Sequence, residues 1–240
     1  MENMLSRSTL EEITRLLGQL WKRLIGPNRN FWIEALKRFL RQDEPVFAKV
    51  RSEVTVSFAK ERRSWQKFYK KIFGADLDLS KVHISERPDP AKDWWLIIVA
   101  NGMTPQRLYN KNKELFPCWC WTDENLDEIV ESERIAKDGH YAVWIRRRVE
   151  ADEEFKNLSA NDLKKQGHKG ITLEERLLLE LHYFWKTKKH LDIQNVTLCT
   201  ASRYSSGSVP RVDWVVGRLR VHWCDSGHAS DHLRSREAVS

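Results

Sequence analysis

The side chains best suited to metal binding or hydrolysis lie close together near the end of the sequence. Residues 222–232 carry three histidines, one cysteine, two aspartates and two serines, namely His222, Cys224, Asp225, Ser226, His228, Ser230, Asp231 and His232. Imidazoles and thiolates are ligands that zinc prefers, and serine, histidine and aspartate are the residue types of a hydrolytic triad. Cys118 and Cys120 would add two thiolates from one face of a strand. A small hydrolase or metal-dependent enzyme centred on residues 222–232 is therefore one candidate function.

The spacing of these side chains argues against a preformed site. The sequence has no Cys-x-x-Cys pair, and His228 and His232 share a face only if the segment that contains Gly227 is helical. It also has no Gly-x-Ser-x-Gly turn, no Gly-x-x-x-x-Gly-Lys loop and no Gly-x-Gly-x-x-Gly turn. We therefore predict no catalytic residue, no bound metal and no cofactor, and we expect buried thiols with histidines at the surface.

Basic side chains alternate with aromatic ones in two expected strands. The strand at 141–149 places Trp144, Arg146 and Arg148 on one face, and the second arm of a hairpin at 209–223 does the same for Arg218, Arg220 and His222. If the two strands are neighbours, these side chains form one exposed face on which the arginines hold phosphates and Trp144 stacks on a base. The alternative is that a helix covers the face, buries Trp144 and leaves the arginines paired with carboxylates such as Asp152, Glu153 and Glu154.

The net charge of the protein is concentrated in the first third of the chain. Residues 1–73 hold 16 Lys/Arg and 8 Asp/Glu, a net charge of +8, whereas residues 74–240 hold 25 and 26, a net charge of −1. The densest basic cluster is made by Arg62, Arg63, Lys67, Lys70 and Lys71. A segregated basic charge of this kind indicates an anionic partner such as nucleic acid or a membrane surface. A solvated lysine-rich helix surface or a basic protein-interaction module would give the same pattern.

Helical periodicity dominates the segment that carries this charge. Ser8 with Glu11 is a capping box ahead of an apolar stripe that ends at Gly26-Pro27, and a second helix follows from about residue 31. Apolar residues from Val46 to Ile72 then recur about every four positions, which predicts a long helix with a break near Val54. The prolines at 88 and 90 disfavour helix and mark a domain boundary.

Strands alternate with helices in the rest of the chain. We expect strands at 94–100, 118–121, 141–149 and 196–201 and a hairpin at 209–223 that turns near Val216-Gly217. We expect helices at 104–116, 124–134, 160–166 and 173–188, the last preceded by a capping box of Thr172 and Glu175, and a polar loop from 225 onward. The sequence therefore predicts an α+β protein with a basic helical domain at 1–85 and a mixed sheet domain with packed helices and a C-terminal hairpin at 91–240.

Composition excludes several classes of protein. Hydrophobic residues make up 41% and charged residues 31% of the chain, a globular balance. The longest apolar run, residues 94–100, is far short of the roughly 20 residues that span a bilayer, so we expect no membrane partner. The first residues lack the basic start of a secretory signal, and four cysteines without paired spacing indicate a reducing compartment, so we expect a cytoplasmic protein. Eleven tryptophans make the chain tryptophan-rich.

Several short segments resemble a group of bacterial proteins of uncharacterised function. The segments are Trp-Gln-Lys-Phe-Tyr at 65–69, Phe-Pro-Cys-Trp at 116–119, Arg-Val-Glu-Ala-Asp-Glu-Glu at 148–154, Gly-Ile-Thr-Leu-Glu-Glu-Arg at 170–176 and Leu-Arg-Ser-Arg-Glu-Ala-Val-Ser at 233–240. The resemblance covers residues 65–240 and implies a bacterial origin, with no functional residue to carry over. From the residues themselves we predict a non-enzymatic protein that binds DNA or RNA through its basic helical segment.

Overall fold

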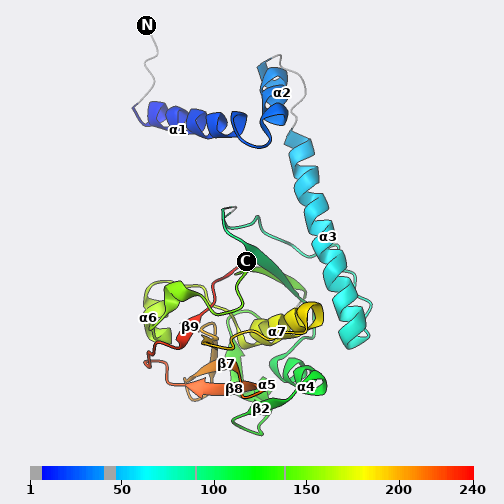
Figure 1. Ribbon diagram of the computed structural model, residues 1–240, viewed down its shortest axis with the longest axis vertical. Helices are drawn as coiled ribbons and strands as arrows, with labels where there is room; N and C mark the ends of the chain where they lie inside the picture. Colours follow the sequence, from blue (N-terminus) through cyan, green and yellow to red (C-terminus); the bar gives the residue numbers. More distant parts are fainter. Residues whose placement is uncertain (1–6, 41–46, 90, 138) are drawn as a thin grey trace. The chain divides into compact units, whose positions relative to one another are not determined.

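The computed structural model describes residues 7–40, 47–89, 91–137 and 139–240 and shows the α+β fold that the sequence predicts (Figure 1). Its contacts divide the chain into two compact units, residues 1–58 and 59–240. None of the described helices has the length and apolar character needed to cross a bilayer.

The first unit contains helix α1 (Arg7–Leu24), helix α2 (Arg29–Leu40) and the beginning of helix α3 (Phe47–Phe73). Gly26 and Pro27 separate α1 from α2 as predicted, and the guanidinium of Arg23 lies 4.4 Å from the ring centroid of Trp32. The apolar stripe of α1 is open to solvent, because Trp21 on it is 64% exposed.

Helix α3 is continuous from Phe47 to Phe73, so the break expected near Val54 is absent from it. The division between the two units falls inside this helix, whereas the sequence placed a boundary at residues 85–91. Trp65, Phe68 and Tyr69 explain the difference, since all three are fully buried within the second unit. The second half of α3 thus belongs to the sheet domain.

The first sheet has the strand order β1 (Trp94–Val99), β4 (Tyr141–Arg146) and β10 (Ala238–Val239), and both pairings are antiparallel. Helix α7 (Leu173–Thr187) contacts β1, helix α4 (Pro105–Leu115) and strand β7 (Val209–Val215). Every residue of α7 from Leu173 to Leu181 is buried, which makes this helix the centre of the core.

The second sheet has the order β2 (Cys118–Cys120), β8 (Arg218–Cys224), β7 (Val209–Val215), β5 (Val196–Leu198) and β9 (Leu233–Ser235). The β2–β8 and β5–β9 pairs are parallel, and the others are antiparallel. The predicted hairpin is present as β7 and β8. A small separate sheet pairs β3 (Val130–Ser132) with β6 (Ser202–Tyr204).

Three predicted helix starts are confirmed by their caps. Thr104 accepts a hydrogen bond from the N–H of Arg107 at the start of α4, and capping boxes at Ser159 and Thr172 begin helix α6 (Ala160–Lys165) and helix α7. Such caps satisfy backbone N–H groups that have no partner inside the helix. A 3-10 turn, η1 (Glu153–Phe155), follows β4.

Two expectations for the second unit are wrong. The acidic segment 124–134 forms only one helical turn, α5 (Leu126–Ile129), because residues 130–132 pair with β6 instead. The polar segment after residue 225 forms β9 and β10, and its Arg236 is fully buried. A hydrophobicity pattern does not predict these two strands, because charged residues lie within and between them. Arg236, between β9 and β10, is buried although it is charged, because it forms an ion pair with Asp192.

Candidate functional site

Five basic side chains form a stripe along one side of α3 within the second unit. Lys60, Arg63, Lys67, Lys70 and Lys71 are all exposed. At 100° per residue they fall on one side of the helix, opposite the buried Trp65 and Tyr69. We call these five residues the α3 stripe.

Few negative charges lie close to the α3 stripe. Asp76, whose Oδ2 is 2.8 Å from Nζ of Lys70, is the single carboxylate within ion-pair distance of the stripe among the described residues. Both partners are well exposed, so water and salt screen this pair. The ion pair raises the pKa of Lys70. The other four cations of the stripe remain available to an anionic ligand.

Arg62, which the sequence groups with these cations, is oriented differently. Its Nη2 donates a hydrogen bond to the carbonyl of Val82 at 2.8 Å, and the side chain is half-buried. Lys60 takes its place in the stripe. The helical spacing of Lys60, three residues before Arg63, was the signal that could have identified it from the sequence.

An aromatic ring with two cations beside it lies at the end of α3. Arg107 and Lys111 of α4 lie 5.8 Å and 5.7 Å from the ring centroid of Phe73, which is half-buried. Lys111 also pairs with Glu114, and Arg107 donates a hydrogen bond to the carbonyl of Gly102. The basic surface of α3 therefore continues onto α4, and no local sequence signal predicts this contact.

The side chains on β4 are already occupied by contacts within the protein. Trp144 is 3% exposed, its Nε1 donates to the carbonyl of Ser85 at 3.0 Å, and Arg87 lies over its ring. Arg148 makes a bidentate pair with Glu154, and Arg146 lies 3.7 Å from the same carboxylate. The hydrogen bond from Arg148 lowers the pKa of Glu154 to about 2. This is the alternative arrangement considered above, with a loop rather than a helix over Trp144.

The arginines on β8 do not join those on β4, because the two strands belong to different sheets. Arg218 is exposed at the hairpin turn, and Arg220 makes a bidentate pair with Asp213 at 2.9 Å and 2.6 Å. Trp119 of β2 stands opposite Arg220 in the register and is 37% exposed. Sequence reasoning missed Trp119, since the parallel β2–β8 pairing is not visible in the local sequence.

The candidate ligands and catalytic groups at 222–232 do not come together in one place. Cys224 is buried on β8, and burial raises the pKa of its thiol. Asp231 and His232 line an open hollow of about 1010 Å³ together with Arg148. Within the described ranges, no three His, Cys, Asp or Glu residues are grouped closely enough to hold a metal ion.

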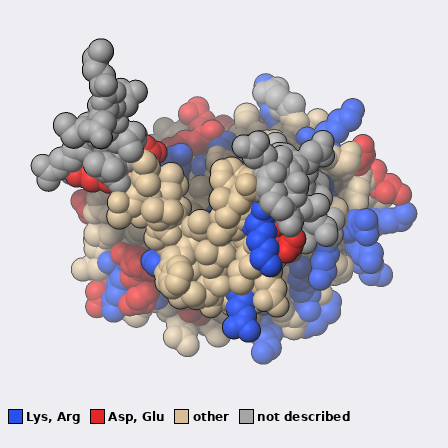
Figure 2. All heavy atoms as spheres, turned by 90° about the horizontal axis from the view of Figure 1, so that it is seen from above, with Lys and Arg blue, Asp and Glu red and all other residues tan. Residues whose placement is uncertain are grey.

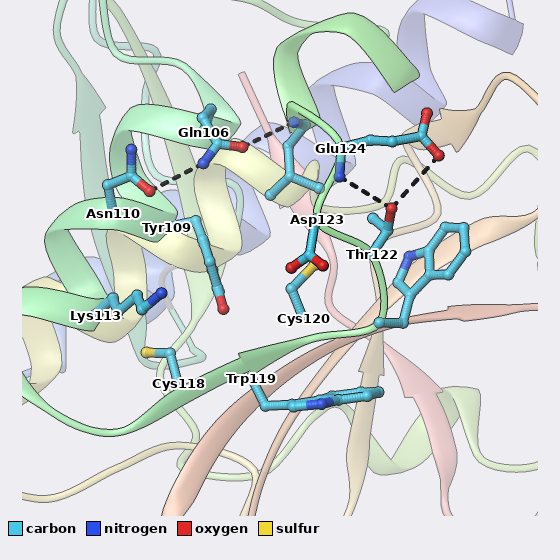
Figure 3. A pocket seen from close by; sticks show the side chains of 12 residues that line it. Gln106, Tyr109, Asn110, Lys113, Cys118, Trp119, Cys120, Thr122, Asp123 and Glu124 are labelled. Atoms are coloured by element: carbon cyan, nitrogen blue, oxygen red, sulfur yellow. Dashed lines mark hydrogen bonds between the residues drawn. The ribbon is translucent and has the colours of Figure 1, made fainter.

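Cys118 and Cys120 line a second hollow, of about 480 Å³, between β2 and α4. Both thiols point from β2 toward Tyr109 and Lys113 of α4, whereas Trp119 lies on the other side of the strand (Figure 3). Burial raises the pKa of Cys118 to about 12 and also raises that of Cys120, so both thiols stay protonated at neutral pH. Protonated thiols are poor nucleophiles and poor metal ligands.

Comparison of the chain with protein-family models, with curated proteins and with solved structures found no match. The site must therefore be judged on its own geometry. Within the part of the chain that the structure describes, four of the five cations of the α3 stripe have no carboxylate at ion-pair distance. Lys and Arg side chains, together with Asp and Glu side chains, are exposed on the face of the molecule drawn in Figure 2.

Proposed function

We propose that the protein binds nucleic acid through the α3 stripe. The observation that carries this proposal is the alignment of five exposed cations on one side of a helix that the core holds in place. Trp65 and Tyr69, on the same helix, are fully buried and hydrogen-bonded to β1. The stripe is therefore presented on a rigid element, which lowers the entropy lost when it meets a ligand.

The spacing of the stripe suits a phosphate backbone. Residues four apart on a helix rise by about 6 Å, so Arg63, Lys67 and Lys71 present cations at regular steps along the helix axis. Phosphates of one nucleic-acid strand repeat at a similar interval, and lysine and arginine contacts to them are independent of base sequence. We therefore expect binding that depends on charge and shape and shows little sequence preference.

The surroundings of Phe73 favour a contribution from single-stranded regions. Arg107 and Lys111 bring cations next to this half-buried ring, the combination used by surfaces that stack bases and hold the backbone. Trp144, in contrast, is enclosed by its own protein and has no free face for a base. Replacing Phe73 by Leu should weaken binding to single strands more than binding to duplexes.

The test is a salt titration of binding to a labelled duplex and to the matching single strand. Each phosphate contact contributes about −0.9 to the log–log slope for duplex DNA, so five contacts predict a slope of roughly −3 to −4.5 between about 50 and 200 mM salt. Replacing all five stripe residues with glutamine should flatten this slope. The fold should persist, because the substituted side chains lie outside the core.

A matched control removes five exposed positive charges elsewhere in the same unit. Glutamine at Lys156, Lys164, Lys165, Lys169 and Lys189 makes the same change in net charge away from α3. This variant should keep most of the slope. Equal losses in both variants would show that overall charge, and not the stripe, determines binding. Absence of binding by the wild-type protein at about 50 mM salt would refute the proposal and leave the stripe as a solvated surface or a docking surface for a protein.

A further inference from the structure

A hollow of about 620 Å³ lies between the start of α4, α5, β3 and the first turn of α7. Met103, Pro105, Val130 and Ile135 supply apolar side chains to its walls. Ile135 is 52% exposed there and presents an apolar surface to the hollow. The hollow belongs entirely to the second unit and is separate from the α3 stripe.

Glu174 lines this hollow and is 1% exposed. Its Oε1 atom is buried and has no hydrogen-bond partner among the residues that the structure describes. Buried polar atoms in folded proteins are nearly always hydrogen-bonded, and an exception calls for an explanation, such as a functional role or a water molecule or ion that supplies the partner. Burial, and after it the negative charge of Glu175, raises the pKa of Glu174 to about 8, and the nearby hydroxyl of Tyr141 and N–H of Ala136 offset part of this rise.

The neighbouring Glu175, in the same turn of α7, has hydrogen-bond partners for both of its carboxylate oxygens. Nε and Nη2 of Arg134 donate to its two oxygens, each at 2.8 Å, and the N–H of Thr172 donates to Oε2 at 2.9 Å. Among the described residues, Glu174 forms no ion pair with a lysine or arginine. Of the two adjacent carboxylates, only Glu175 is thus paired with a guanidinium.

The charges of the residues that line the hollow indicate which kind of ligand would fit beside Glu174. Asp127 and Glu131 add two carboxylates to the lining, and Lys137 supplies the single lysine or arginine within it. Asp127 already accepts hydrogen bonds from Oγ1 of Thr104 and the N–H of Gln106. A ligand that fits must therefore bring a positive charge to Glu174 and an apolar body to Met103 and Ile135.

We infer that this hollow binds a small organic cation, a guanidinium or ammonium group on an apolar body, with the cationic head against Glu174. The head supplies the counter-charge and the hydrogen-bond donors that Oε1 lacks. The body replaces water over Ile135. This inference goes beyond nucleic-acid binding and does not depend on it.

The probes are N-butylguanidinium and N-butylurea, which share a planar head and an apolar tail and differ in charge. Binding is followed by calorimetry and by the methyl NMR signal of Met103, which lies in the wall of the hollow. The guanidinium should bind at least about tenfold more tightly than the urea, because its hydrogen bond to a carboxylate is charge-assisted. Equal affinities for the two probes, or no shift of the Met103 signal, would overturn the inference.

Glu174→Gln tests the residue itself, and Glu128→Gln serves as the matched control. Glu128 is an exposed carboxylate on α5 that does not line the hollow. Glu174→Gln should remove the preference for the charged probe, whereas Glu128→Gln should keep it. A preference that survives in a folded Glu174→Gln protein would assign the cation to another carboxylate and refute the inference.

A pH series on the wild-type protein gives a second readout if Glu174→Gln fails to fold. The guanidinium keeps its charge throughout, and the ionised fraction of Glu174 rises on passing a pKa of about 8. Affinity for N-butylguanidinium should therefore increase about tenfold from about pH 7 to about pH 9. The charged and titratable groups around Glu174 are Glu175, Asp127, Glu131, Tyr141, Arg134 and Lys137. An affinity that stays constant over this range would contradict a role for Glu174.

Discussion

The hydroxyl group of Tyr69 makes the two hydrogen bonds beside Ala100 that a neighbouring strand would otherwise make with the edge of β1. It donates a hydrogen bond to the carbonyl of Ile98 at 2.7 Å and accepts one from the N–H of Ala100 at 3.0 Å. One turn earlier on α3, Nε1 of Trp65 donates to the carbonyl of Leu96 at 2.9 Å. Four residues of helix and two residues of strand both advance by about 6 to 7 Å, so the two aromatic side chains match the free edge of β1.

Tyr69→Phe should therefore lower the free energy of unfolding by about 2 kcal/mol, because it leaves two buried backbone groups without a partner. Urea denaturation followed by circular dichroism measures the change. Tyr109→Phe is the control, because Tyr109 borders an open hollow. Loss of its hydroxyl group should not leave two buried backbone groups without hydrogen-bond partners. Equal effects of the two substitutions would show that the edge of β1 does not depend on Tyr69.

Val216→Asn should stabilise the protein by about 1 kcal/mol, because Val216 occupies a backbone conformation that β-branched residues disfavour. The φ angles of Val216 and Gly217 are 50° and 71°, as in a type I′ hairpin turn, for which Asn-Gly is the preferred pair. The side chain of Val216 is 86% exposed, so its removal costs no packing. Thermal unfolding should show a higher midpoint for the variant, and an unchanged or lower midpoint would contradict the prediction.

Asp192→Asn should destabilise the protein by about 3 to 5 kcal/mol, since among the described residues it leaves the buried guanidinium of Arg236 without an ion-pair partner and that of Arg176 with Glu180 alone. Asp192 lies 2.9 Å from Arg176 and 2.6 Å from Arg236, and all three side chains are fully buried. Guanidinium chloride denaturation measures the loss. Asp213→Asn is a suitable comparison, because its partner Arg220 is partly exposed and water screens the remaining charge. A smaller loss for Asp192→Asn than for Asp213→Asn would be evidence against the buried network.

Acid should unfold the protein in part through His182. Burial, and to a smaller extent Lys186, lowers the pKa of His182 to about 3, and the ring stacks on Trp65 at a centroid distance of 4.0 Å. Because the unfolded state binds a proton near pH 6.5 and the folded state does not, the stability from this residue is lost as the pH falls from about 6.5 toward 3. His182→Phe keeps the stacking and should make the stability less sensitive to acid. Equally steep acid unfolding of both proteins would exclude His182 as a contributor.

Local signals in the sequence predicted the parts of the fold that depend on neighbours along the chain. The caps at Thr104, Ser159 and Thr172 and the turn at Val216-Gly217 are set by residues a few positions apart, and the structure has all of them. The β2–β8 pair depends instead on residues about a hundred positions apart. Nothing in the local sequence around Trp119 predicts Arg220 as its cross-strand neighbour.

The residues of the candidate site also fall into those that local spacing predicts and those that depend on contacts distant in the sequence. Arg63, Lys67, Lys70 and Lys71 share one side of a single helix, so helical spacing alone placed them together. For Arg148 the sequence left two arrangements open, an exposed face or pairing with a carboxylate such as Glu154, and the structure has the second. Glu174 had no sequence signal at all, because the missing partner of a carboxylate is visible only once every neighbour is in place.

Residues 233–239 have a consequence for how the protein is made. Strand β9 pairs with β5 and strand β10 pairs with β4, so this short segment completes one edge in each of the two main sheets. A nascent chain that has reached residue 232 therefore presents two unpaired strand edges at once. Open edges of this kind invite pairing with other chains. We expect the two sheets to be complete only after residues 233–239 have left the ribosome, and the chain to need protection from aggregation until then.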